Sequence, residues 1–112
     1  MLLVVATLSY KIMNIIRWKG NKPVTQSEIE SKIKDQGLEY YIWQDGMGAF
    51  YPTHSHPYTE IRWVVSGSIT FGVGGDEVIL NPGDCLELPA NVPHYAKMSD
   101  ETTTIYLCAS KL

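Results

Sequence analysis

Three histidines and one glutamate are the residues of this chain whose types and spacing most clearly permit chemistry. His54 and His56 stand one residue apart, Glu60 follows after a short Pro57–Thr59 excursion, and His94 comes much later. On a strand, alternate side chains point to the same face, so both imidazoles can reach one ion. Glu60 shares their parity if the chain resumes the strand in phase, and His94 can complete the set from a later strand.

These four side chains predict a site for one divalent transition-metal ion. A lone histidine is usually a hydrogen-bonded core or surface residue. Here the chain contains only three histidines, and all three belong to the set. Three imidazoles and a carboxylate suit Fe, Mn, Ni, Zn, Co or Cu, and the set lacks the thiolates typical of structural zinc. An octahedral ion would keep two positions open for water, dioxygen or a chelating substrate.

The same parity places Arg62 on the interior face, beside Glu60. A buried guanidinium is costly unless an anion pairs with it, so Arg62 is a candidate clamp for a substrate carboxylate or enolate. Two other interpretations stay open. Strand twist or a bulge would let Arg62 reach solvent, or it would pair with an internal acid such as Glu87.

Apolar residues of matching parity are expected to form the wall of a substrate pocket near the metal. Such a wall suits a small organic ligand, although the same residues could be ordinary barrel core. The residues expected near the metal are Phe50, Leu86, Leu88, Ala96 and Met98, and the substrate pocket is expected to include Phe50, Arg62, Leu88 and Met98. Tyrosines at 51, 58 and 95 neighbour the ligands and either hydrogen-bond near the metal or merely pack.

Short apolar or alternating runs, separated by turn residues, must position these side chains. This rhythm is typical of a β-sandwich or barrel. Glycines at Ser66-Gly67, Gly74-Gly75-Asp76 and Asn81-Pro82-Gly83-Asp84 predict tight turns, because they tolerate positive φ. We expect strands near residues 13–18, 38–43, 47–54, 60–66, 68–73, 77–80, 85–88, 93–98 and 102–109.

One helix is expected between the first two strands. Thr25 and Glu28 form a capping box, Ile29 and Ile33 lie one turn apart, and Gly37 supplies the stop.

Composition limits the class of protein. The 112 residues suit one domain, and 45% apolar residues argue against disorder. A net charge of −3, with scattered Lys and Arg, gives no footprint for nucleic acid. No run approaches the roughly 18 apolar residues of a membrane helix, and the apolar start lacks the basic residues of a signal peptide. Cys85 and Cys108 are interpreted as reduced thiols of a cytoplasmic protein, with a disulfide as the lesser alternative.

Two motifs in the chain resemble those of the cupin superfamily. Gly48-x5-His54-x-His56-x3-Glu60-x6-Gly67 agrees with the first cupin motif at every specified position. Gly83-x5-Pro89-x-Asn91-x2-His94-x3-Met98 agrees with the second except at two positions. Asn91 replaces a glycine, and asparagine is the residue that best tolerates a left-handed turn after glycine. Met98 replaces an asparagine that is not a metal ligand in the family.

The resemblance implies an all-β double-stranded β-helix, or jelly-roll, barrel with one short N-terminal helix. The residues themselves suggest the bounds: residues 13–112 are expected to form this domain, and residues 1–12, which precede a second methionine and contain β-branched residues, are expected to be an extension or an edge strand. His54, His56, Glu60 and His94 would then project into the mouth of the barrel, and small cupins are often homodimers.

Two classes of function agree with this site. In the first, the protein is a metal-dependent enzyme, most plausibly a dioxygenase acting on a small chelating compound, with isomerase or lyase chemistry also open. Glu60 would accept a proton and Arg62 would hold an anionic group. In the second, the protein is a noncatalytic module that binds a small ligand or senses a metal, and fold alone does not separate the two.

Overall fold

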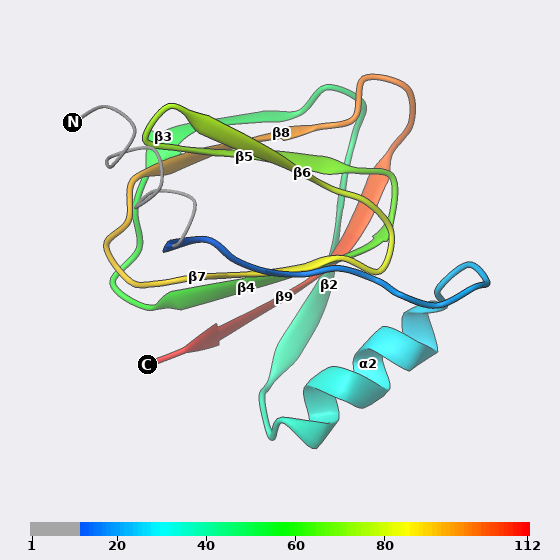
Figure 1. Ribbon diagram of the computed structural model, residues 1–112. Coiled ribbons are helices and arrows are strands. Elements are labelled where there is room, and N and C mark those ends of the chain that lie inside the picture. Colours follow the sequence, from blue (N-terminus) through cyan, green and yellow to red (C-terminus); the bar gives the residue numbers. More distant parts are fainter. Residues whose placement is uncertain (1–11) are drawn as a thin grey trace.

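Nine strands and helix α2 make up residues 12–112, the part of the chain that the computed structural model describes (Figure 1). The expected N-terminal extension lies, apart from Ile12, outside these residues. One antiparallel sheet has the order β1-β7-β4-β9-β2, made of Asn14–Ile16, Cys85–Leu88, Thr59–Ser66, Thr104–Lys111 and Tyr40–Asp45. The other has the order β3-β8-β5-β6, made of Phe50–His54, His94–Met98, Ile69–Val73 and Asp76–Leu80.

The two sheets face each other, and their inner faces carry the main apolar core (Figure 1). Strand β8 shows the underlying pattern, since His94, Ala96 and Met98 are buried whereas Lys97 between them is exposed. Such period-two alternation is expected for facing antiparallel sheets. This arrangement is the predicted all-β jelly-roll architecture.

Helix α2 (Gln26–Asp35) covers the outer face of the five-stranded sheet (Figure 1). The side chain of Thr25 accepts a hydrogen bond from the Glu28 amide at 3.2 Å, which confirms the expected N-cap. Ile29 and Ile33 are almost fully buried against the sheet, and Gly37 ends the segment at φ +73°. No helix within residues 12–112 is long and apolar enough to span a membrane.

Several predicted strand boundaries differ from the structure, as for the strand expected at 38–43, which runs from Tyr40 to Asp45. The strand expected from residue 47 begins at Phe50, because Gly48 has a φ of 69° and the Ala49 amide bonds the Gly46 carbonyl at 3.2 Å, which closes a turn there. The strand expected at 102–109 runs instead from Thr104 to Lys111, where it pairs with Thr59. Glycines 67, 74, 75 and 83 all have positive φ, as their turns require.

The left-handed conformation expected at Asn91 is present, with a φ of 66°. Its amide donates to the His56 carbonyl at 2.7 Å, so this turn also holds the backbone of a candidate ligand. Replacing Asn91 with alanine is expected to lower the free energy of unfolding by about 1 kcal/mol. In the left-handed region a Cβ crowds the following carbonyl oxygen, and alanine lacks the polar side chain that lets asparagine offset this cost with a local hydrogen bond. Replacement with glycine is expected to change it by less than about 0.5 kcal/mol.

Urea unfolding of both variants checks this prediction. An alanine variant as stable as the original protein would contradict it.

Candidate metal centre

The three histidines converge at one end of the space between the sheets. His54 at the end of β3 pairs directly with His94 at the start of β8. Because β3 stops at His54, His56 lies in the following loop, where the amide of Asn91 holds its carbonyl. One ring nitrogen from each histidine lies within 4.8 Å of those of the other two, which is close enough for one ion.

Backbone contacts orient two of the imidazole rings for metal binding. Nδ1 of His54 lies 2.6 Å from the Pro52 carbonyl, and Nδ1 of His94 lies 2.8 Å from the Val92 carbonyl. A carbonyl can only accept, so each Nδ1 carries a proton, and Nε2 is the ring nitrogen that remains available to a metal ion. This is the tautomer in which histidines ligate metals through Nε2.

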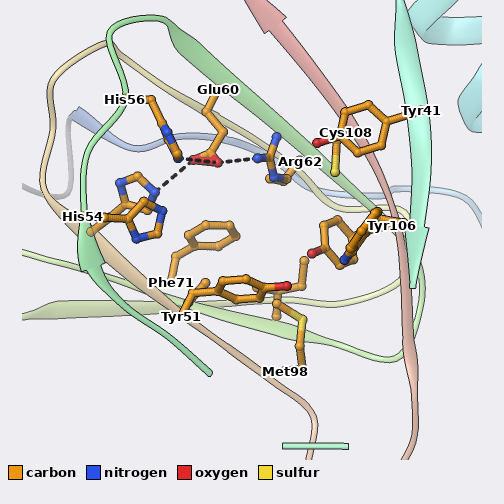
Figure 2. A pocket seen from close by; sticks show the side chains of 14 residues that line it. Tyr41, Tyr51, His54, His56, Glu60, Arg62, Phe71, Met98, Tyr106 and Cys108 are labelled. Atoms are coloured by element: carbon orange, nitrogen blue, oxygen red, sulfur yellow. Dashed lines mark ion pairs between the residues drawn. The ribbon is translucent and has the colours of Figure 1, made fainter. Parts of the chain in front are cut away.

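Glu60 lies on β4 next to these free nitrogens, and only 4% of its surface is exposed. Its Oε1 is 3.5 Å from Nε2 of His56 (Figure 2). Its Oε2 is 3.0 Å from Nε2 of His94. Oε2 is buried, and apart from this charged contact with His94 it has no hydrogen-bond partner. A buried carboxylate oxygen without a partner is costly, and a cation among these groups would satisfy it. The residues therefore fit a metal ion.

The protonation states of the site also suit a cation. Burial lowers the pKa of His56, which favours its neutral form. Burial alone would raise the pKa of Glu60, but the contact with His94 and the guanidinium of Arg62 outweigh it and hold the pKa below its usual range. Burial acts to lower the pKa of His94, but the contact with Glu60 outweighs it and raises the pKa. The proton that Glu60 favours on His94 occupies the position that a metal ion would take.

Arg62 points inward, as its parity predicts, and pairs with a ligand of the proposed ion. Its Nη2 lies 2.5 Å from Oε1 of Glu60, and its Nη1 donates to the Ile61 carbonyl at 2.9 Å. The alternative partner Glu87 is instead 2.6 Å from Nζ of Lys111. The positive charge of Arg62 therefore lies in the cavity wall beside Glu60.

A cavity of about 260 Å³ extends from the histidines. This is below the usual range for drug-sized ligands and suits a small molecule. Arg62 and Met98 lie in its wall, as expected, together with Ala96. Its full lining is Tyr41, Trp43, Tyr51, His54, His56, Glu60, Arg62, Ile69, Phe71, His94, Ala96, Met98, Tyr106 and Cys108.

Phe50 and Leu88 lie outside the cavity, contrary to expectation. The pairing of β3 with β8 shifts between Tyr51 and His54, which reverses the parity of the residues before the shift. Tyr51 therefore lines the cavity, while Phe50 is 56% exposed.

Leu88, like Leu86, does face the other sheet, but both belong to the filled apolar core. They lie on β7, on the other side of β4 from β9 and β2, which supply much of the cavity wall.

Strands β2 and β9 contribute wall residues that sequence reasoning missed. Tyr41 and Trp43 come from β2, and Tyr106 and Cys108 from β9. Each pair shares strand parity, but nothing in the sequence places β2 and β9 beside the histidine strands. Figure 2 shows His54 and His56 on one side of the cavity and Tyr41, Tyr106 and Cys108 on the other.

Both cysteines are free and buried, as the reduced-thiol interpretation expects. Burial raises the pKa of Cys85 to about 12, compared with about 8.5 for an ordinary thiol. In a Cys108→Ala variant, where Cys85 is the only thiol, disulfide reagents at pH 8 are expected to react about a thousandfold more slowly with folded than with urea-unfolded protein. Equal rates would contradict the burial of Cys85. A Cys85→Ala variant is the control, because Cys108 lines the cavity and is expected to react sooner.

Known proteins resemble this chain in sequence and in fold. The acireductone dioxygenase of Exiguobacterium sibiricum is 34% identical over 61 residues, which cover 50% of this chain and 34% of that protein. The one of Bacillus subtilis is 33% identical over 57 residues, covering 46% and 32%. The chain thus spans about a third of the length of these relatives.

Solved structures extend the likeness. The DMSP lyase DddQ of Ruegeria pomeroyi superposes with a TM-score of 0.59 and 29% identity, covering 67% of this chain and 38% of the lyase. A cupin 2 domain-containing protein of Halorhodospira halophila gives a TM-score of 0.67 at 13% identity, covering 88% and 77%, and supports the fold alone. The model of the Cupin_2 family, "Cupin domain", matches residues 42–110. The chain therefore belongs to the cupin family.

Proposed function

We propose that this cupin binds one divalent transition-metal ion through His54, His56, Glu60 and His94, and that it is a metal-dependent enzyme for a small chelating organic compound. The observation that carries the proposal is the convergence of three imidazole nitrogens within 4.8 Å, beside a buried carboxylate oxygen that has no hydrogen-bond partner. The similarity to acireductone dioxygenases supports dioxygenase-like chemistry. The similarity to a DMSP lyase supports lyase chemistry as the second candidate.

The bound ion would supply Lewis-acid or oxygen chemistry at its open positions. Arg62 would orient the substrate, because its guanidinium has five N–H donors and uses only part of them on Glu60 and the Ile61 carbonyl. Glu60 would accept a proton when its carboxylate loosens from the ion. Ile69, Phe71 and Met98 would exclude water from the reacting groups.

Metal analysis of the purified protein, coupled to oxygen uptake with candidate chelating compounds, tests this function. A dioxygenase is expected to hold about one ion per chain and to consume oxygen only when Fe or another active metal is loaded. Substrate loss without oxygen uptake would identify a lyase or isomerase. Tight ligand binding without turnover under any metal would favour a noncatalytic module, and the absence of metal binding would refute the proposal.

The proposal includes a homodimer in the cytoplasm. Within residues 12–112, β2 forms the edge of its sheet and pairs only with β9, so it offers an open edge to a second copy. Two free thiols agree with a reducing compartment. A sizing column tests the assembly, and a protein lacking residues 1–12 shows whether that segment is needed for it.

A further inference from the structure

The cavity end remote from the histidines is organised by Asp45, a half-buried residue at the end of β2. Its carboxylate accepts hydrogen bonds from the hydroxyl of Tyr106 at 2.7 Å, the hydroxyl of Tyr51 at 2.9 Å and the indole N–H of Trp43 at 3.1 Å. All three aromatic side chains line the cavity. Asp45 therefore ties together three rings from strands β2, β3 and β9.

These bonds determine what the aromatic end can offer to a ligand. A tyrosine hydroxyl has one hydrogen, and an indole has one N–H. Tyr51, Tyr106 and Trp43 already donate theirs to Asp45, so they present only oxygen lone pairs and π-electrons to another molecule. Burial raises the pKa values of both tyrosines, so they stay protonated and keep these bonds at neutral pH. This end is electron-rich and has no donor of its own among the three groups.

Its negative charge is not neutralised by the protein. Within residues 12–112, no Lys, Arg or His nitrogen lies within ion-pair distance of Asp45. Trp43 is 48% and Tyr51 is 37% exposed, so a ligand can reach this end from solvent. Asp45 itself does not line the cavity, so a small cation at this end would contact the rings of Trp43, Tyr51 and Tyr106 and be attracted by the carboxylate charge that lies behind their polar groups.

The opposite end of the cavity carries positive charge. Along β4, Glu60 faces Ser110, Arg62 faces Cys108 and Val64 faces Tyr106. Because Val64 is the partner of Tyr106, the distance along β4 from Glu60 to the level of Tyr106 is four residues, or about 13 Å. Arg62 lies between the two ends (Figure 2). With a divalent ion on neutral histidines, the Glu60 end has a net positive charge, and the cavity becomes dipolar.

From this polarity we infer that the ligand of the cavity is a small zwitterion. Its anionic head reaches the metal and Arg62, and a compact onium group, such as a quaternary ammonium, lies against Trp43, Tyr51 and Tyr106 near Asp45. The inference about the anionic head rests on the proposed metal function, whereas the inference about the cationic tail rests only on Asp45 and the three aromatic residues bonded to it.

Two isosteric probes test the inference. 3-(Trimethylammonio)propionate and 4,4-dimethylpentanoate share a carboxylate and a tail of the same shape, and differ in whether the tail is cationic nitrogen or neutral carbon. Calorimetric titration of the metal-loaded protein is expected to show about tenfold tighter binding of the zwitterion. Replacing Asp45 with asparagine should lower this ratio several-fold, to the part that the aromatic rings contribute, and leave the affinity for the neutral-tailed probe unchanged.

A matched control exists on the outside of the molecule. Glu77 accepts a hydrogen bond from the hydroxyl of Tyr95, so it is also a carboxylate tied to a tyrosine, but neither residue lines the cavity. A Glu77→Gln variant should keep the full preference for the zwitterion.

Three results would overturn the inference: equal binding of both probes, binding of neither probe to metal-loaded protein, or an Asp45→Asn variant that loses affinity for both probes equally. The last would mean that Asp45 only positions the tyrosines. Metal content is measured on every sample, so failure of the metal site is seen separately, as protein that does not load.

Discussion

A protein in which His54 and His56 are both replaced by alanine is expected to lose stoichiometric metal. The pair supplies two of the three nitrogens that converge within 4.8 Å, and neither remaining ligand can move into their place from β4 or β8. Loss of an outer partner of a metal ligand already costs about 10–100-fold in affinity, so loss of two ligands should cost more than about 10⁴-fold. Metal analysis after dialysis checks this result, and any metal-dependent turnover should disappear with the ion.

The fold is expected to survive this double change. Three-quarters of the His56 side chain is buried, but it borders an open cavity, so truncation leaves few packed contacts unsatisfied. Thr53→Ala is the matched control, because Thr53 precedes His54 on β3 and is exposed. Full metal occupancy in the His54/His56 variant, with Thr53→Ala also fully loaded, would refute the site.

Replacing Arg62 with methionine is expected to destabilise the metal-free protein by about 3 kcal/mol. The Glu60 side chain is 5% exposed and that of Arg62 is 16% exposed, so removal of the guanidinium leaves a buried carboxylate without its closest positive partner. Urea unfolding at neutral pH measures the loss. Bound metal should reduce it, because the ion supplies positive charge to the same carboxylate.

The destabilisation by Arg62→Met should depend on pH in a defined direction. Glu60 has a depressed pKa in the folded protein, so its ionised form stabilises the fold above its unfolded pKa of about 4.3. That stabilisation disappears as the pH falls through the lower folded value. The difference between Arg62→Met and the original protein should therefore be largest at neutral pH and shrink in acid.

Two further variants separate the buried pair from a general loss of charge. Lys22 and Glu28 form an exposed pair at 3.0 Å, so Lys22→Met should cost far less stability than Arg62→Met. Adding Glu60→Gln to Arg62→Met should restore part of the lost stability, because it removes the unpaired charge. An Arg62→Met variant as stable as Lys22→Met would show that the Glu60 contact is unimportant to the fold.

Local patterns in the sequence were enough to predict most of the framework. The Thr25 cap, the glycine turns and the positive φ of Asn91 follow from the conformational limits of single residues, and the structure contains all three. Period-two alternation predicted the strands to within a few residues, except where Gly48 closes a turn ahead of β3.

The pairing between strands determines which residues line parts of the cavity, and period-two alternation within each strand could not predict these residues. The register shift between Tyr51 and His54 exchanged Phe50 for Tyr51 in the wall. A single extra residue reverses every side chain beyond it, and the signal available in the sequence is Pro52, because a proline within a strand favours a bulge or a sheet edge. The sheet order likewise placed Leu88 in the filled core and brought Tyr41 and Tyr106 to the cavity.

Residue types, short-range parity and two motifs were enough to predict the fold class, four candidate metal ligands and the inward direction of Arg62. The pairing of Arg62 with Glu60 and the three aromatic donors around Asp45 came from long-range contacts. Asp45 and Tyr106 are 61 residues apart in the chain. Their contact depends on how β2 and β9 pair across the sheet, which is a long-range choice that local propensities do not encode.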